Sequence, residues 1–246
     1  MAGTWWGTQT EMFGPRNAHR VGLMFRELRE LSPNSLVLEA AVGLGDVAER
    51  LRRGGHRVIG ADLSLDVLLG ARTRSSAPLV LADVTRLPFR DAAFDCVTSA
   101  ETLEHVPDDG AAAGEFARVL KNGGALIVTV PALEALRTFS DTYYEHLRRY
   151  TRAQLVRLVA SRGFVVKRAD YWGFPFVVAY DYLFMLPLNL RRARRPVQSD
   201  AGLRAVATAG RMRGLVRAVA GLFATDQWFR WLPIGVGLVL TARKKT

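Results

Sequence analysis

One stretch near the beginning of the chain, residues Val37–Asp62, constrains the fold more than any other. An apolar segment that ends in Glu39 leads into Gly43 and Gly45, then into a helix-like segment and a second apolar run that closes on an acid. This order is typical of a β-strand, a tight glycine turn, a helix and a second, parallel strand. Such a unit binds an adenosine-containing cofactor, so we predict an α/β protein with a nucleoside-containing ligand.

The glycine turn is compatible with two kinds of cofactor site. Residues 43–48 fit the G-x-G-x-x-A pattern of dinucleotide sites, with Asp62 placed to face a ribose. The same turn fits the E-x-G-x-G-x-G pattern of S-adenosylmethionine sites if Ala41 replaces the first glycine. Glu39 favours the second kind, because a carboxylate suits a cationic sulfonium ligand and repels a pyrophosphate. A plain tight turn beside a solvated acid is the third interpretation.

Four later motifs carry a family resemblance: Leu-Pro-Phe at 87–89, Phe-Asp-x-Val at 94–97, Leu-Glu-His-Val at 103–106 and Leu-Lys-x-Gly-Gly at 120–124. In order and spacing they resemble class I S-adenosylmethionine-dependent methyltransferases, in the branch that includes ubiquinone- and menaquinone-biosynthesis enzymes. The resemblance covers about residues 34–170. It departs from the family at Ala41, where glycine is usual. Alanine suits that turn if its φ angle is negative.

The resemblance implies S-adenosyl-L-methionine as cofactor and assigns site residues. The methionine and ribose approach would be lined by Glu39, Ala41, Gly43 and Gly45. Asp62 would accept both ribose hydroxyls, and Leu63 would flank the adenine. Asp83 would take the adenine amino group, with Val84 beside it, and Ala100 and Glu101 would lie near the sulfonium. Residues 100–103 read Ala-Glu-Thr-Leu, not the Asn-Pro-Pro-Tyr of many enzymes that methylate amide or nucleobase nitrogens. The acceptor atom is therefore expected to be oxygen, or else carbon.

The alternation of apolar runs and helical patterns predicts a doubly wound parallel sheet. The family order implies seven strands in the Rossmann-like order 3-2-1-4-5-7-6, with the last strand antiparallel. Strands are predicted near Ser35–Glu39, Arg57–Asp62, Leu79–Leu81, Phe94–Ser99, Ala125–Val130, Val165–Tyr171 and Gly235–Thr241. Helices are predicted over Pro15–Leu31, Gly45–Arg53, Ser64–Arg74, Asp109–Val119 and Arg152–Ser161. We expect a single methyltransferase domain over residues 1–246, with an N-terminal helical segment over 1–33.

His146 is the candidate catalytic residue if the acceptor is a hydroxyl. It lies in a segment, residues 146–151, that resembles the His-x-Arg-Arg-Tyr-Thr segment of the same branch, and a histidine titrates near neutrality as a general base should. The alternative is that it only orders a loop. No metal site is expected, because the histidines are scattered and Cys96 is the only cysteine. His105 is expected to fix a turn, and His19 to lie at the surface.

The positive charge is concentrated near the C-terminal end. The chain has 34 basic and 23 acidic residues, and 12 of the basic but only 3 of the acidic residues lie in 171–246. This part contains Trp172–Pro233, about sixty residues where the family joins two strands by a short hairpin. Apolar residues Gly173–Leu190 are followed there by the basic run Arg191–Arg195 and by a predicted amphipathic helix, Arg211–Phe223.

This insertion, residues 172–233, has two interpretations that the sequence leaves open. Basic residues beside an apolar stripe suit a helix on an anionic membrane, with Trp228 and Trp231 as anchors. The same stripe suits a helical subdomain or a homo-oligomer contact. Nucleic acid is a weaker candidate, because the arginines are interleaved with aliphatic residues. Since the sixth strand ends at the ligand-binding edge, the insertion is also expected to cover the acceptor site.

Three functions follow from these observations. The first is a methyltransferase that acts on a small or amphiphilic, lipid-like acceptor in the biosynthesis of a secondary metabolite, a quinone or a similar compound. The second is a nicotinamide-dependent oxidoreductase, and the third a non-catalytic scaffold that keeps the cofactor pocket. Residues 1–14 show no signal-peptide pattern, and no run of about 18 uncharged apolar residues occurs. A cytoplasmic protein is expected, peripheral on the inner face of the membrane if the insertion binds lipid.

Overall fold

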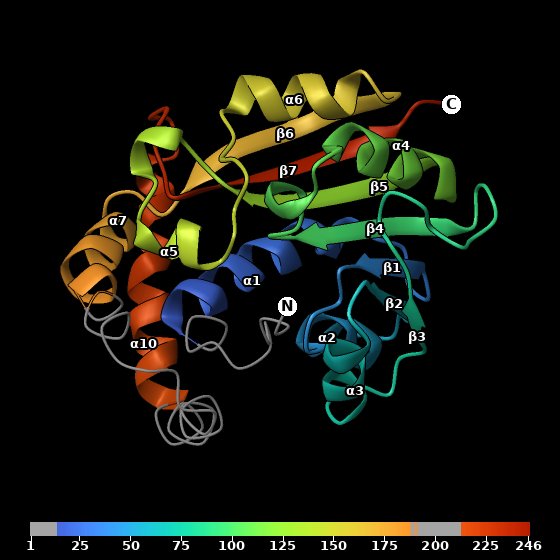
Figure 1. Cartoon of the computed structure of the whole chain (residues 1–246), viewed down its shortest axis with the longest axis horizontal. Helices are drawn as coiled ribbons and strands as arrows, with labels where there is room; N and C mark the ends of the chain where they lie inside the picture. Colours follow the sequence, from blue (N-terminus) through green and yellow to red (C-terminus); the bar gives the residue numbers. More distant parts are fainter. Residues whose placement is uncertain (1–13, 188–189, 191–212) are drawn as a thin grey trace.

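The computed structural model describes residues 14–187, 190 and 213–246, and it is built around one mixed β-sheet (Figure 1). The strands are β1 (Leu36–Ala40), β2 (Arg57–Asp62), β3 (Leu79–Leu81), β4 (Phe94–Ala100), β5 (Leu120–Pro131), β6 (Phe164–Trp172) and β7 (Gly237–Lys244). The longer helices are α1 (Pro15–Glu27), α2 (Asp46–Arg53), α3 (Leu65–Arg72), α4 (Asp109–Val119), α6 (Arg152–Ala160) and α10 (Arg213–Phe223). The short helical turns are η3 (Leu28–Glu30), η4 (Leu103–His105), η5 (Glu134–Leu136), α5 (Phe139–Tyr143), α7 (Phe176–Tyr180), η6 (Asp181–Met185) and η7 (Ala224–Phe229).

The seven strands lie in the order β3-β2-β1-β4-β5-β7-β6, as predicted. Strand β7 pairs antiparallel with both β5 and β6, so β6 runs parallel to β5 and ends at the same edge of the sheet. This direction matters for function, because the segment that follows β6 starts at the edge where α/β proteins bind their ligands.

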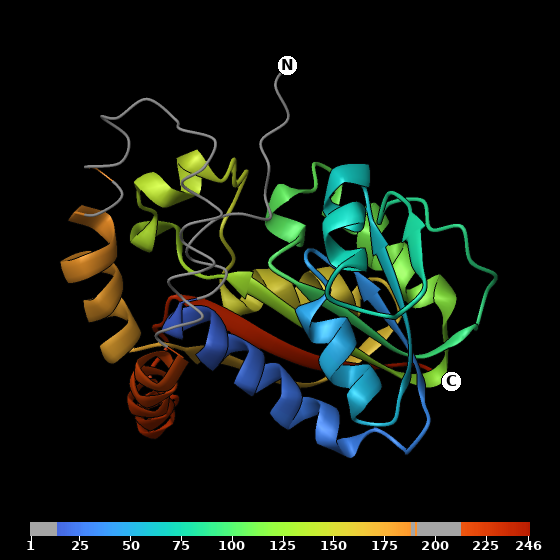
Figure 2. The same ribbon diagram turned by 90° about the horizontal axis from the view of Figure 1, so that it is seen from below.

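Helices cover both faces of the sheet, which explains why its strands are apolar on both sides. On one face, Ile127 of β5 packs in a cluster with Met24 of α1 and Leu51 of α2. On the other face, Leu126 of β5 packs with Phe116 of α4 and with residues of α6. Figure 2 shows α1 running along the first face. The two clusters fix the strands in register, so the residues at the strand ends have defined positions.

Some element boundaries differ from the prediction. The first helix becomes a 3-10 turn at Leu28, and β5 begins at Leu120, five residues before the expected start at Ala125. The early start follows from a β-bulge: Phe94 pairs with Leu120 and Cys96 with Ala125, so β5 has extra residues between the two pairs. The short turns η5 and α5 were not predicted.

Between β6 and β7 the described residues are mostly helical. A cluster of Leu23, Trp172, Val177 and Phe223 joins this insertion to α1, and Figure 2 shows α10 against the start of α1. The predicted basic run Arg191–Arg195 lies outside the described residues. Within the described part of the chain, no helix is both long and apolar enough to cross a bilayer.

The apolar stripe predicted for Arg211–Phe223, the segment that contains α10, is divided between two environments. Phe223 is buried in the cluster and Val219 packs against it, whereas Leu222 is 53% exposed. Trp228 and Trp231, which follow α10, are 73% and 74% exposed. One side of the helix therefore attaches the insertion to the domain, and another side presents apolar surface to solvent.

Candidate functional site: the carboxyl edge of the sheet

The turn after β1 is held in an unusual backbone conformation. Ala41, Gly43 and Gly45 have φ angles of 63°, 54° and 78°. The N–H of Val42 donates to the carbonyl of Ala61 at 2.8 Å, and the N–H of Gly45 donates to the carbonyl of Val42 at 3.0 Å. The expectation of a negative φ at Ala41 is therefore wrong. The turn requires the left-handed region at this position, and alanine occupies it at a cost of about 1–2 kcal/mol.

The predicted cofactor residues lie at one edge of the sheet. Pairing of β1 with β2 and β4 places Glu39 beside Gly60 and Thr98, while Asp62 and Ala100 end their strands nearby. Gly60 permits this close arrangement, since a Cβ atom there would lie 2.6 Å from the side chain of Val42.

Glu39 is the most informative residue of this edge. It is 3% exposed, and its Oε2 atom is buried without a hydrogen-bond partner. Burial first, and then the nearby Asp46 carboxylate, raise the pKa of Glu39 well above its usual value. A buried carboxyl group with an unpaired oxygen fits a ligand that brings a hydrogen-bond donor or a positive charge.

Asp62 is fixed by the backbone around it. One of its carboxylate oxygens accepts from the N–H of Gly43 and the other from the N–H of Ser64, both at 3.1 Å. Burial raises the pKa of this carboxyl. Each oxygen keeps a second lone pair, so the carboxylate can also accept from two vicinal hydroxyls of a ribose. Leu63 beside it is 71% exposed and offers an apolar surface for a base.

Asp83 and Val84 follow β3 at the same edge. Asp83 is exposed and accepts hydrogen bonds from the N–H and the hydroxyl of Thr85, at 2.8 and 2.7 Å. Val84 is buried. The pair combines a polar group open to solvent with an apolar neighbour, which is suitable for the edge of an adenine.

Glu101 follows β4 with a φ of 50°, and α1 contributes a residue that sequence reasoning missed. Arg20 lies 3.9 Å from a carboxylate oxygen of Glu101 and donates to the hydroxyl of Thr129 at 3.2 Å. The positive charge of Arg20 also lowers the pKa of Glu39, against the larger effect of burial. No spacing rule connects Arg20 with these acids, because α1 precedes the first strand and only the tertiary structure brings it to this edge.

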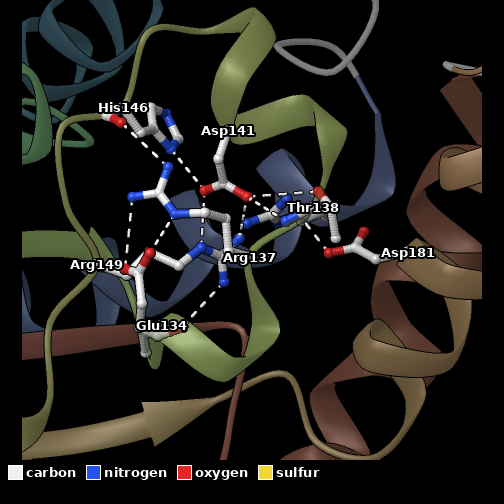
Figure 3. Close-up of polar contacts among 9 residues, drawn as sticks. Glu134, Arg137, Thr138, Asp141, His146, Arg149 and Asp181 are labelled. Atoms are coloured by element: carbon white, nitrogen blue, oxygen red, sulfur yellow. Dashed lines mark hydrogen bonds and ion pairs between the residues drawn. The ribbon is translucent and has the colours of Figure 1, made fainter.

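His146 lies in the loop after β5, next to a buried acid (Figure 3). Its Nδ1 atom is 2.8 Å from Oδ1 of Asp141, which also accepts from Nε of Arg149 at 2.7 Å. The backbone N–H of Thr138 donates to Oδ2 of Asp141 at 2.7 Å. Burial alone raises the pKa of Asp141, but hydrogen bonds from His146 and Arg149 outweigh it and hold this pKa below its usual range. Asp141 therefore stays ionised and orients the imidazole.

The expectation that the histidines are scattered is wrong. The ring centroids of His105 and His146 lie 4.7 Å apart, and Glu104 lies beside them. Burial first, and then the proximity of His146, lower the pKa of His105 to about 4. His19 is also not a surface residue: it is buried against Trp172, and burial lowers its pKa to about 4.

Comparison with known proteins agrees with this geometry. Residues 38–128 match the family model described as a methyltransferase domain. This part of the chain is therefore a methyltransferase domain. The matched residues contain the end of β1 and all of β2, β3 and β4, whose carboxyl ends form the site described above.

Two curated relatives of this chain are named demethylmenaquinone methyltransferase. The demethylmenaquinone methyltransferase of Mycolicibacterium vanbaalenii is 37% identical over 124 residues, which cover 50% of this chain and 54% of the relative. That of Corynebacterium kroppenstedtii is 36% identical over 124 residues, with the same shares. The chain thus spans about half the length of the curated relatives it matches.

Solved structures share the fold across nearly the whole chain. A chain from the complex of the Trm112 methyltransferase activator of Haloferax volcanii matches with a TM-score of 0.66 at 18% identity, covering 98% of this chain and 96% of its own. Phosphoethanolamine N-methyltransferase 2 of Haemonchus contortus, in complex with S-adenosyl-L-methionine, matches with a TM-score of 0.63 at 15% identity, covering 92% of this chain and 52% of its own. The [4+2]-cyclase SpnF matches with a TM-score of 0.64 at 23% identity, covering 94% of this chain and 82% of its own. One fold therefore supports different reactions.

Proposed function

We propose that this chain, as one domain over residues 1–246, transfers a methyl group from S-adenosyl-L-methionine to an oxygen atom of a small or amphiphilic acceptor. A carbon atom is the second choice of acceptor. The observation that carries the proposal is the buried carboxyl of Glu39, whose Oε2 atom has no hydrogen-bond partner, beside the backbone-fixed carboxylate of Asp62. The two groups provide what the cationic methionine end and the ribose hydroxyls of this cofactor require. A pyrophosphate would be repelled at the same place.

The cofactor, when bound, supplies a methyl carbon activated by a positively charged sulfur, and the carbon–sulfur bond breaks as the new bond to the acceptor forms. The residues of the chain position the two partners in line, which provides most of the rate enhancement for such a displacement. With Nδ1 of His146 hydrogen-bonded to Asp141, Nε2 is the nitrogen left to accept a proton. We propose that Nε2 takes the proton that an acceptor hydroxyl loses.

The insertion supports an amphiphilic acceptor. A pocket beside the site is lined by Arg16, Thr138 and Arg149 and by the apolar residues Met185 and Leu186 after β6. Mixed polar and apolar walls suit a ligand with a polar head and an apolar body. The curated relatives' name agrees with an acceptor of a quinone type. We propose that the exposed apolar residues of the insertion bring the enzyme to an anionic membrane surface where such acceptors reside.

Isothermal titration calorimetry tests the cofactor part of the proposal. S-adenosylmethionine and S-adenosylhomocysteine should bind, and NAD should not. Asp62→Ala should weaken both affinities about ten- to a hundredfold, because a hydrogen bond to a charged group contributes roughly 1.5–3 kcal/mol. Asp66→Asn, an acid on α3, is the matched control and should bind as the parent does. Tight NAD binding, or an unchanged affinity of Asp62→Ala, would contradict the proposal.

The second candidate is a protein that binds the cofactor but does not transfer its methyl group, either as a scaffold or as an enzyme for another reaction. One observation favours it. The structural similarity to a [4+2]-cyclase shows that the fold alone does not define the reaction. Mass spectrometry of the acceptor after incubation with methyl-labelled cofactor separates the candidates. Incorporation of label supports methyl transfer. Cofactor binding without any labelled product, with extracts that contain the acceptor, would favour the scaffold or another reaction.

A further inference from the structure

Glu104, His105 and His146 form a cluster outside the predicted cofactor residues. Each of the three offers one ligand atom, and these atoms lie within 4.8 Å of one another. Glu104 and His105 lie on η4, directly after β4, and His146 comes from the loop after β5. The cluster therefore lies at the same edge of the sheet as the cofactor residues.

The burial and hydrogen bonding of Glu104 favour a bound cation. The side chain is fully buried, and neither of its carboxylate oxygens has a hydrogen-bond partner. An unpaired buried carboxyl destabilises the folded protein, and more so when it is charged. The neighbouring Glu101 adds a second negative charge to this cost. A cation bound by Glu104 would compensate both effects.

Hydrogen bonds hold both imidazole rings in place. A backbone hydrogen bond to Glu145 holds the ring of His105. Asp141 holds the ring of His146 through Nδ1, at 2.8 Å, and Arg149 in turn fixes Asp141. A carboxylate that orients a histidine from behind is the usual support of a metal-binding imidazole.

We propose that Glu104, His105 and His146 bind one divalent transition-metal ion. Two nitrogens and one carboxylate oxygen suit Zn²⁺, Fe²⁺, Co²⁺ or Mn²⁺, whereas Mg²⁺ and Ca²⁺ prefer oxygen ligands. Ligand atoms around one such ion lie about 3–4 Å apart, so the present separations require small side-chain rotations. Three protein ligands leave coordination positions for an oxygen atom of the acceptor.

This inference deepens the proposed function and rests on it for the role of the ion. An acceptor hydroxyl bound to the ion would lose its proton to solvent water before the transfer, because a metal ion lowers the pKa of a bound hydroxyl. The acceptor is then an ionisable hydroxyl compound, such as a phenol or an enol. In the loaded protein Nε2 of His146 is a ligand, and the ion replaces it as the group that promotes ionisation.

Titration with Co²⁺ tests the site without an assay of activity. Protein is treated with EDTA, dialysed, and titrated with Co²⁺ while its visible absorption and the metal content are measured. We expect one Co²⁺ per chain, displaced by Zn²⁺ but not by an equal concentration of Mg²⁺. Glu104→Gln should lower the affinity at least a hundredfold, and Asp141→Asn, which removes only the support of His146, about 10–100-fold. His56→Gln is the matched control and should bind Co²⁺ as the parent does.

The outcomes separate the two proposals. Absence of stoichiometric Co²⁺, or binding that Glu104→Gln leaves unchanged, would overturn the metal site. Displacement by equimolar Mg²⁺ would overturn the choice of ion class. If Glu104→Gln fails to fold by circular dichroism, His105→Gln gives the same test at a less buried position. Calorimetry with S-adenosylmethionine on the EDTA-treated protein tests the cofactor proposal alone, so either proposal can fail while the other stands.

Discussion

At Ala41 the turn after β1 departs from the glycine pattern of S-adenosylmethionine sites, and its φ of 63° makes the departure testable. Glycine adopts this angle without strain, although it costs more entropy on folding. Ala41→Gly should therefore raise the free energy of unfolding by up to about 1 kcal/mol, or roughly 2–4 °C in Tm. Thermal unfolding measures the change. Ala117→Gly within helix α4 is the control, and should lower the stability by about 1 kcal/mol. A lower Tm for Ala41→Gly would mean that the strain is compensated.

His146 provides a second prediction at this scale. His146→Ala should lower turnover about 10²–10⁴-fold while S-adenosylmethionine binds as before, because the imidazole acts on the acceptor and not on the cofactor. Initial rates and calorimetry on the same preparation measure both effects. His56→Ala should change neither. Unchanged turnover with the true acceptor would leave His146 as a residue that orders its loop through Asp141.

Individual residues differ in how far the sequence predicts them. Glu39 and Asp62 could be placed because each lies within one residue of the end of an apolar strand, and strand ends meet at one edge. Asp141 could not, although His146 is only five positions away, because it lies in a short turn without a periodic pattern. Arg20 could not, because Thr129 is 109 positions away and no periodic pattern connects the two. The same reason hides the approach of His105 to His146, which are about forty positions apart.

At the scale of elements, α10 shows how one amphipathic pattern serves two purposes. The pattern predicts a single apolar face, but the structure buries Phe223 and leaves Leu222 exposed. Periodicity identifies an apolar stripe and does not tell which part of it meets the domain. Short turns such as α5 are missed for a related reason, since five residues are too few for a periodic pattern.

The division of this stripe predicts the behaviour of two variants. Leu222→Asp combined with Trp228→Ser should reduce co-flotation with anionic liposomes at every salt concentration and leave Tm nearly unchanged, because both side chains are exposed. Val219→Asp should instead lower Tm, since Val219 packs against the buried cluster. Failure of the parent protein to float with the liposomes would reject the membrane proposal. A dimer broken by the exposed-residue variant would identify an oligomer contact.

At the scale of the whole molecule, buried histidines make stability depend on pH. The pKa of His19 is about 4 in the folded protein, against 6.5 when the residue is unperturbed. Between these values the unfolded chain binds more protons, so the stability falls as the pH is lowered from about 6.5 to 4. The raised pKa of Glu39 affects the stability in the opposite direction, because the contribution of Glu39 to the free energy of unfolding is lost as the pH rises.

Comparison with a variant isolates the contribution of His19. Urea unfolding of the parent and of His19→Phe at pH 7 and at pH 4.5 should show a smaller acid loss in the variant, by up to about 3 kcal/mol. The ring centroids of His19 and Trp172 lie 5.8 Å apart in the parent, and phenylalanine keeps an aromatic ring at this place. His56→Phe provides the control. Equal acid losses in parent and His19→Phe would show that His19 does not govern this dependence.

The order of the sheet was the best predicted property of the whole molecule, because a family order and an alternation of strands and helices both specify it. The attachment of the insertion was not predictable, since it depends on which apolar residues of α1 remain uncovered by the sheet.

The two ends of the insertion meet at one point of the sheet. Trp172 is paired with Gly237, and its carbonyl accepts from the N–H of Val236 at 2.9 Å. A Cβ atom on Gly237 would lie 2.6 Å from the indole of Trp172, so the two strands close tightly at this place. The entropic cost of closing a loop grows only by about 0.6 kcal/mol for each doubling of its length. The segment between these residues can therefore change in length or sequence at little cost in loop entropy, and under the function proposed above such a change would alter the acceptor while the residues that hold the cofactor stay the same.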